Sequence, residues 1–125
     1  MNTQSILLIE DDQLLREMYM ECLTSDMYTV TPARDGEEAL QKLPERQWDL
    51  VLLDMMLPKI NGYEILKRMQ TEPGLKQYRK LVLMTNVEPD NEFNEAVKMA
   101  DGYITKSEYD PDQFIKKITS FLAGA

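Results

Sequence analysis

The chain has 125 residues, enough for one ordinary domain with a hydrophobic core. Its net charge of -8 excludes direct binding to nucleic acid through a basic surface, because the phosphates would repel the protein. It has no histidine and one cysteine, Cys22, so imidazole metal sites, histidine acid–base chemistry and internal disulfides are excluded as well.

The sequence contains no export or membrane signal. Its longest apolar run is too short to span a bilayer, and its first residues lack the basic and apolar segments of a signal peptide. An unpaired cysteine also fits a reducing compartment. We therefore expect a cytoplasmic protein without membrane insertion.

The first half of the chain alternates strand and helix patterns. Residues 5–9, SILLI, form an apolar run typical of a strand covered on both faces, and Leu15, Met18 and Cys22 then share one face of a helix. A second strand at residues 28–31 ends before Pro32, which a sheet tolerates at its edge. We therefore place this strand at the margin of the sheet.

The second half repeats the alternation. Two further apolar runs, at residues 50–53 and 81–84, predict the third and fourth strands, and a fifth strand ends at Lys106. Three helices are expected to begin at capping residues, which are Asp35 with Glu38, Asn61 with Glu64, and Asp110 with Pro111. A further helix is expected from the apolar face that begins at Phe93. This alternation predicts an α/β fold with a doubly wound five-stranded parallel sheet, in a single domain over residues 1–125.

Polar residues stand where the predicted strands end. Asp54 interrupts an apolar segment and closes the third strand, and two acids, Asp11 and Asp12, follow the first. Thr85 closes the fourth strand and Lys106 the fifth. The carboxyl ends of parallel strands meet at one edge, where ligands bind. If the first and third strands are neighbours, three carboxylates crowd together, and such hard oxygens favour Mg²⁺, or Mn²⁺, over zinc.

Each of these residues also has a purely structural explanation. Asp12 is suited to cap the first helix, and an aspartate at a strand end is often a solvated turn residue. A threonine there is often a cap, and a lysine a surface charge. A salt link that filled the pocket without a metal would count against a metal site. It is the combination at four strand ends that favours a functional site.

Five segments carry a resemblance to a known family: LLIEDD, RDGEEAL, DMMLPKINGYEIL, LVLMT and DGYITK. Over essentially its whole length the chain resembles the receiver domain of bacterial two-component response regulators, of the stand-alone, single-domain type. The resemblance implies a flavodoxin-like sheet with strand order 2-1-3-4-5. It leaves open whether the chain is complete or is one domain of a longer protein.

The resemblance implies a phosphoryl-accepting site. Asp54 is similar to the phosphoacceptor aspartate. Asp12 and Asp54 resemble direct magnesium ligands, Asp11 one that acts largely through water, and the backbone carbonyl of Met56 a further ligand. Thr85 and Lys106 resemble the hydroxyl and the cation that bind the phosphoryl group.

The resemblance also implies a switch and its partners. Tyr103 matches an aromatic residue that turns inward together with Thr85. The donor is expected to be a sensor histidine kinase or a histidine phosphotransfer protein. The surface of the fourth helix, fifth strand and fifth helix would then engage a downstream protein or form a weak dimer, and the chain would not be a turnover enzyme.

Two departures from the family keep alternatives open. Ser107 follows Lys106 where proline is usual, and Asn86 follows Thr85 where a small residue is common. These support a degenerate receiver that serves only as a binding or dimerisation module. A magnesium-dependent phosphatase with an aspartate nucleophile is a third class, but its Asp-x-Asp signature is missing at Asp54-Met55-Met56.

Overall fold

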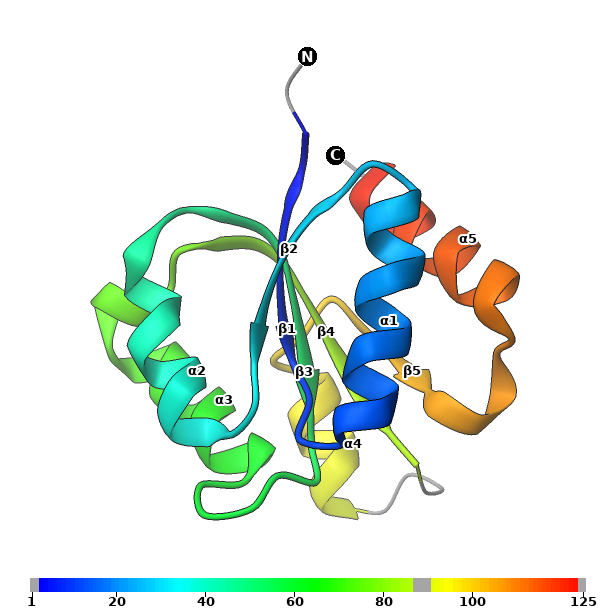
Figure 1. Cartoon of the computed structure of the whole chain (residues 1–125). Coiled ribbons are helices and arrows are strands. Elements are labelled where there is room, and N and C mark those ends of the chain that lie inside the picture. Colours follow the sequence, from blue (N-terminus) through cyan, green and yellow to red (C-terminus); the bar gives the residue numbers. More distant parts are fainter. Residues whose placement is uncertain (1–2, 87–90, 124–125) are drawn as a thin grey trace.

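The computed structural model describes residues 3–86 and 91–123. Five parallel strands form one sheet in the order β2-β1-β3-β4-β5, between two layers of helices (Figure 1), which confirms the predicted fold and strand order. The strands are β1 (Ser5–Ile9), β2 (Thr29–Ala33), β3 (Trp48–Asp54), β4 (Tyr78–Thr85) and β5 (Gly102–Thr105). The α-helices are α1 (Gln13–Ser25), α2 (Gly36–Lys42), α3 (Gly62–Thr71), α4 (Asn91–Val97) and α5 (Pro111–Ala123).

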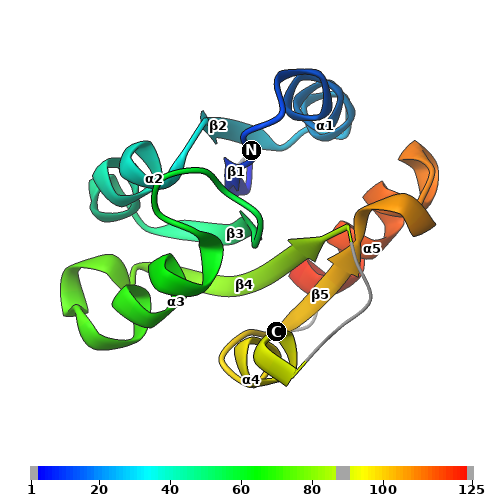
Figure 2. The same cartoon turned by 90° about the horizontal axis from the view of Figure 1, so that it is seen from below.

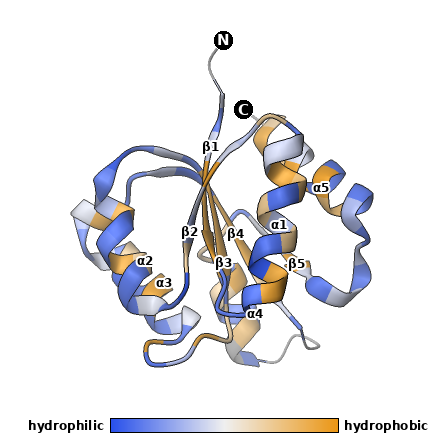
Figure 3. Ribbon diagram, viewed as in Figure 1, coloured by the Kyte–Doolittle hydropathy of each residue, from blue (hydrophilic) through white to orange (hydrophobic). Residues whose placement is uncertain are grey.

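The apolar runs of the strands reflect burial on both faces of the sheet. Alternate side chains of a strand point to opposite faces, so Leu7 and Ile9 pack under α2, α3 and α4 while Ile6 and Leu8 pack under α1 and α5. Figure 2 separates these two helical layers, and Figure 3 shows apolar strands between helices whose outer faces are polar. Among the described residues, none of the helices combines the length and the apolar character that a membrane span requires.

The second strand lies at the sheet edge, as predicted, but its bounds differ. It runs to Ala33 and contains Pro32, which pairs in register with Leu8. The Ala33 carbonyl accepts a hydrogen bond from the Glu10 N–H, so it faces β1. Successive residues of a strand direct their backbone groups to opposite sides, so the Pro32 nitrogen faces away from β1 and the missing N–H leaves no gap.

The first helix buries a different stripe from the predicted one. Tyr19 and Leu23 are buried, whereas Met18 is 40% exposed and Cys22 is half-buried. Both spacings fit a helical period, but α5 decides the orientation, because Tyr19 stacks on Phe114 with ring centroids 4.7 Å apart. The core position therefore belongs to the tyrosine.

The predicted helix starts at the three capping residues are confirmed. The side chains of Asp35, Asn61 and Asp110 each accept a backbone N–H three residues ahead, at 2.8 to 2.9 Å. Capping of this kind contributes about 1 kcal/mol per helix. It also fixes where each loop at the carboxyl edge of the sheet ends.

Candidate functional site

The carboxyl ends of β1, β3, β4 and β5 lie at one edge of the sheet. Figure 2 looks directly onto this edge. Ile9 pairs with Leu53, Asp54 with Met84, and Thr85 with Thr105. The residues that end each strand, or follow it directly, therefore come within reach of one another. This register is what allows the polar residues at the strand ends to form one site, as the sequence predicts.

Three acids gather at this edge, and they are Glu10, Asp11 and Asp54. One carboxylate oxygen from each lies within 4.8 Å of the other two, and Glu10 is fully buried. Among the described residues this is the only group of metal-ligating side chains with such spacing. The sequence prediction had missed Glu10.

Asp12, predicted as a direct metal ligand, lies outside this group. Its Oδ1 accepts the Leu15 N–H at 3.0 Å and caps α1, which begins at Gln13. Three acids follow β1 in succession, and the one directly before a helix is needed as its cap. Counting back from the helix start would have assigned Asp12 to the cap and left Glu10 and Asp11 as the acidic pair.

Lys106 connects the acids across the sheet. Its Nζ lies 2.9 Å from Asp54 Oδ2 and 2.5 Å from Glu10 Oε1, and all three side chains are at least 94% buried. The Asp54 contact is a directed hydrogen bond, whereas the Glu10 contact has the geometry of an ion pair alone. Glu10 Oε2 in turn accepts the Asp12 N–H at 3.1 Å.

This salt link leaves the site negative. Three carboxylates face one ammonium group, so two negative charges are unbalanced when all four groups are ionised. Burial raises the pKa of Asp54 to about 6, against the lowering effects of Lys106 and of the Met56 N–H, with the Glu10 charge adding to the rise. Lys106 and the Met56 N–H lower the pKa of Asp54 but do not offset the effect of burial. Lys106 therefore fills part of the site but does not neutralise the negative charge of its three carboxylates.

The neighbouring groups respond to the same imbalance. Burial and the charge of Asp54 raise the pKa of Asp11. Burial works against the ammonium form of Lys106, but the charge of Asp54 and the contacts with Glu10 and Asp54 outweigh it and raise the pKa of Lys106. Lys106 is thus held as a cation.

The loop after β3 holds Asp54 in place. Its Oδ1 accepts the Met56 N–H at 3.0 Å, and the Gly62 N–H bonds to the Met55 carbonyl at 3.3 Å. A Cβ at Gly62 would lie 2.6 Å from the Asp54 carbonyl oxygen, so only glycine lets the start of α3 pack this close. The Met56 side chain is 62% exposed beside the site.

The remaining predicted residues lie on β4 and β5. Thr85 is buried at the end of β4, and Tyr103 is 41% exposed with its ring edge-on to Phe93, the centroids 5.3 Å apart. There is no cis peptide in the described chain, so the Lys106–Ser107 bond is trans. A serine at 107 therefore does not prevent Lys106 from reaching both carboxylates.

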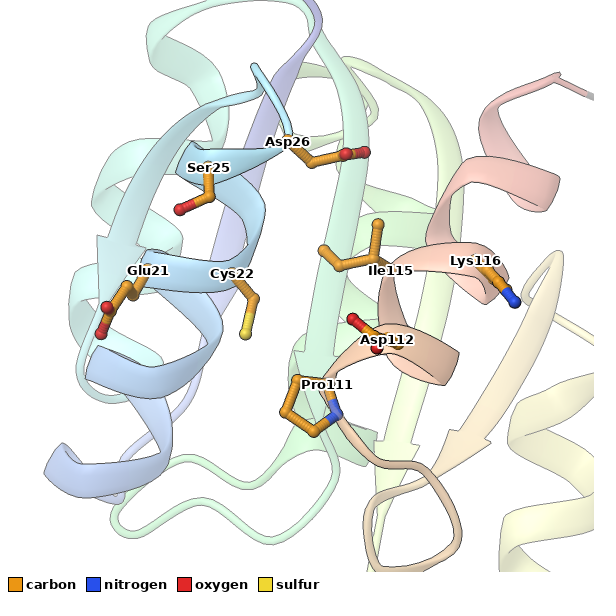
Figure 4. A pocket seen from close by; sticks show the side chains of 8 residues that line it. All are labelled: Glu21, Cys22, Ser25, Asp26, Pro111, Asp112, Ile115 and Lys116. Carbon is orange, nitrogen blue, oxygen red and sulfur yellow. The ribbon is translucent and has the colours of Figure 1, made fainter.

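A separate cavity of about 510 Å³ lies between α1 and α5 (Figure 4). Cys22, Asp26 and Asp112 line it, together with Lys116. Burial and the charges of Glu21 and Asp112 raise the pKa of the Cys22 thiol, which disfavours the reactive thiolate. The cavity contains none of the residues of the acidic site.

Comparison with known proteins gives a consistent match. The family model of the response regulator receiver domain matches residues 6–119. A transcriptional regulatory protein of Bacillus subtilis, YcbL, is 36% identical over 103 residues, which cover 80% of this chain but only 43% of that protein. The polar-differentiation response regulator DivK of Brucella ovis is 27% identical, covering 98% of this chain and 99% of DivK. A solved structure described as the BeF3-activated DrrB receiver domain is 28% identical with a TM-score of 0.77, covering 98% of this chain and 99% of that one.

Proposed function

Because the chain belongs to the response regulator receiver domain family, we propose that it is a two-component signalling switch that accepts a phosphoryl group on Asp54. One observation carries this assignment: a buried carboxylate closes the central strand and lies 2.9 Å from a buried lysine, inside a group of acids with uncompensated charge. Receiver domains are signalling modules, and we propose that this one modifies only itself rather than turning over a substrate.

The transfer step follows from the residues at the edge. A carboxylate oxygen of Asp54 attacks phosphorus in line, the phosphorus–nitrogen bond of a phosphohistidine donor breaks, and its electron pair returns to the imidazole, which takes up a proton. Lys106 already touches Asp54 and is positioned to neutralise an oxygen of the incoming group. Thr85, at the end of the next strand, supplies the hydroxyl.

The acidic group fits a divalent cation. Three carboxylates without a nearby histidine offer the hard oxygen ligands of Mg²⁺, with Mn²⁺ as a substitute. Glu10, Asp11 and Asp54 would hold it, with the Met56 carbonyl as a further ligand, while Asp12 stays with the helix. When bound, the cation neutralises charge on the transferring phosphoryl oxygens. The raised pKa of Asp54 also fits a carboxylate that needs this additional positive charge.

The phosphoryl group would also operate the switch. It adds about 1.5 to 2 negative charges at neutral pH, which Thr85 and Lys106 would bind. Tyr103 packs edge-on to Phe93 and is partly exposed, so an inward turn of this ring would change the surface of α4, β5 and α5. We propose that this surface engages a downstream protein or a second copy weakly. The donor would be a cytoplasmic sensor histidine kinase or phosphotransfer protein.

Formation of a covalent adduct tests this function. The chain is incubated with Mg²⁺ and acetyl phosphate, and intact mass is followed over time. We expect one phosphoryl group per chain, and none in Asp54→Ala; Asp49→Ala removes an acid from the opposite end of the same strand and is the matched control. A chain that takes up neither the phosphoryl group nor beryllofluoride would be a degenerate binding module. Repeated release of phosphate, many per chain, would instead identify an enzyme.

A further inference from the structure

Arg16 contacts the acidic site through the backbone. Its Nη1 donates hydrogen bonds to two successive carbonyls, Glu10 at 3.0 Å and Asp11 at 3.2 Å. One guanidinium nitrogen carries two hydrogens, so it can serve both carbonyls at once. Arg16 lies on α1, six residues beyond Glu10, and thereby joins the helix to the end of β1.

Arg16 is not held by a carboxylate. No carboxylate oxygen of the described residues lies within 4.0 Å of its guanidinium, although three acids directly precede the helix. Its backbone N–H bonds to the Asp12 carbonyl at 2.8 Å. Arg16 therefore contacts the carbonyls of three successive residues, and these contacts fix the path of the turn that carries the acids.

This turn needs such support because its acids repel one another. Glu10 and Asp11 are adjacent in the chain and close to Asp54, so in the metal-free protein like charges favour their separation. Within the turn, Glu10 Oε2 holds the Asp12 N–H at 3.1 Å. Arg16 donates to the carbonyl side of the same turn, at Glu10 and Asp11.

We propose that Arg16 is a positioning residue that holds Glu10 and Asp11 ready to bind the divalent cation. Its contacts are with the backbone carbonyls and do not engage the carboxylate oxygens of either acid. Supporting groups of this kind orient ligands and commonly change metal affinity by about 10–100-fold. The inference rests on the metal site of the proposed function.

The charge of Arg16 and its positioning role predict opposite changes in Mg²⁺ affinity when the residue is replaced. A cation close to the site repels a second cation, so loss of the charge alone would strengthen Mg²⁺ binding. Loss of positioning would weaken it. Arg16→Gln removes both the charge and the two-carbonyl contact, so the sign of the change in affinity tells which effect is larger. Arg16→Lys keeps the charge and a donor and serves as the conservative rescue.

The experiment measures Mg²⁺ dissociation constants of the full chain by titration followed with NMR. We expect binding to weaken about tenfold in Arg16→Gln, with much of the affinity restored in Arg16→Lys. Arg79→Gln is the matched control, since Arg79 donates to the Leu122 carbonyl at 2.8 Å from the amino end of β4. It should leave the dissociation constant unchanged while lowering stability, as followed by urea unfolding.

A second readout uses the metal-free protein. In Arg16→Gln the Asp12 amide is expected to exchange its hydrogen faster with solvent, because the turn that holds it is loosened. Equal or tighter Mg²⁺ binding by Arg16→Gln would overturn the inference and leave the proposed function standing. If the unaltered chain binds no Mg²⁺, the metal site of the proposed function is wrong, and the role of Arg16 falls with it.

Discussion

The acids at the amino edge and those at the carboxyl edge of the sheet have different kinds of partner. At the amino edge, Asp49 accepts the Ser5 N–H at 2.8 Å and Asp101 accepts the Leu81 N–H at 2.7 Å. Each of these carboxylates accepts from a neutral backbone N–H. Asp49 thereby joins β3 to β1, and Asp101, directly before β5, joins its loop to β4. At the carboxyl edge, Lys106 is ion-paired with two of the three carboxylates, those of Glu10 and Asp54. The amino edge thus holds the sheet together, whereas the carboxyl edge retains uncompensated charge that a cation and a phosphoryl group can use.

The largest expected effect is on stability and differs in sign between the edges. Asp54→Asn should raise the free energy of unfolding of the metal-free protein at pH 7 by about 1–3 kcal/mol, since it removes a buried charge whose pKa is raised. Asp101→Ala, the control at the amino edge, should lower it by about 1–2 kcal/mol, because the Leu81 N–H loses its acceptor. Urea unfolding measures both. Destabilisation by Asp54→Asn would mean that Lys106 fully compensates the carboxylate.

The same pKa sets the pH at which this difference appears. The folded chain keeps the Asp54 proton up to about pH 6, whereas the ordinary pKa of an aspartate is 3.8. The folded state therefore binds more protons than the unfolded state between about pH 4 and pH 6, and the contribution of Asp54 to stability falls as pH rises through this window. Asp54→Asn lacks this dependence, so its advantage over the unaltered chain should vanish below pH 4. Saturating Mg²⁺ should also reduce the advantage at pH 7, because it stabilises only the carboxylate form.

A second prediction separates the roles of two nearby acids on the turn after β1. Glu10→Gln should weaken Mg²⁺ binding about tenfold or more, which is about 1.4 kcal/mol, because it removes one charge from the acidic group. Asp12→Ala should lower helix stability by about 1 kcal/mol and change the affinity little, because Asp12 caps α1. Isothermal titration and thermal unfolding of both variants check this. Weaker Mg²⁺ binding in Asp12→Ala, with little change in Glu10→Gln, would instead identify Asp12 as the metal ligand.

The smallest expected effect lies at the amino edge, in the turn between α1 and β2. Met27 has a φ of 74°, a left-handed conformation that glycine adopts freely, and its side chain is 65% exposed. Met27→Gly should therefore raise the free energy of unfolding by about 0.5–1 kcal/mol and leave Mg²⁺ binding unchanged. Denaturant unfolding with and without Mg²⁺ measures this. A destabilised variant would show that the methionine side chain contributes more than the backbone strain costs.

Much of the fold could be predicted because its signals are local. Continuous apolar runs indicated strands buried on both faces, and Asp35, Asn61 and Asp110 marked helix starts within one turn of the residues that they cap. The prediction failed where two local solutions were equally good. Met18 and Tyr19 both fit a helical stripe, and only packing against Phe114 on α5 chose the tyrosine.

The site follows the same division. That acids, a threonine and a lysine stand at the strand ends can be read from the amino-acid sequence, because strand ends are recognised from neighbouring residues. Which of the acids lie close together depends on how the strands and helices pack. Asp54 and Lys106 are 52 residues apart and become partners through the register of β3, β4 and β5. Asp12 caps the start of α1 and so lies outside the acidic group, and Arg16 joins this helix to the turn after β1. Distances between elements depend on packing, which no local pattern contains.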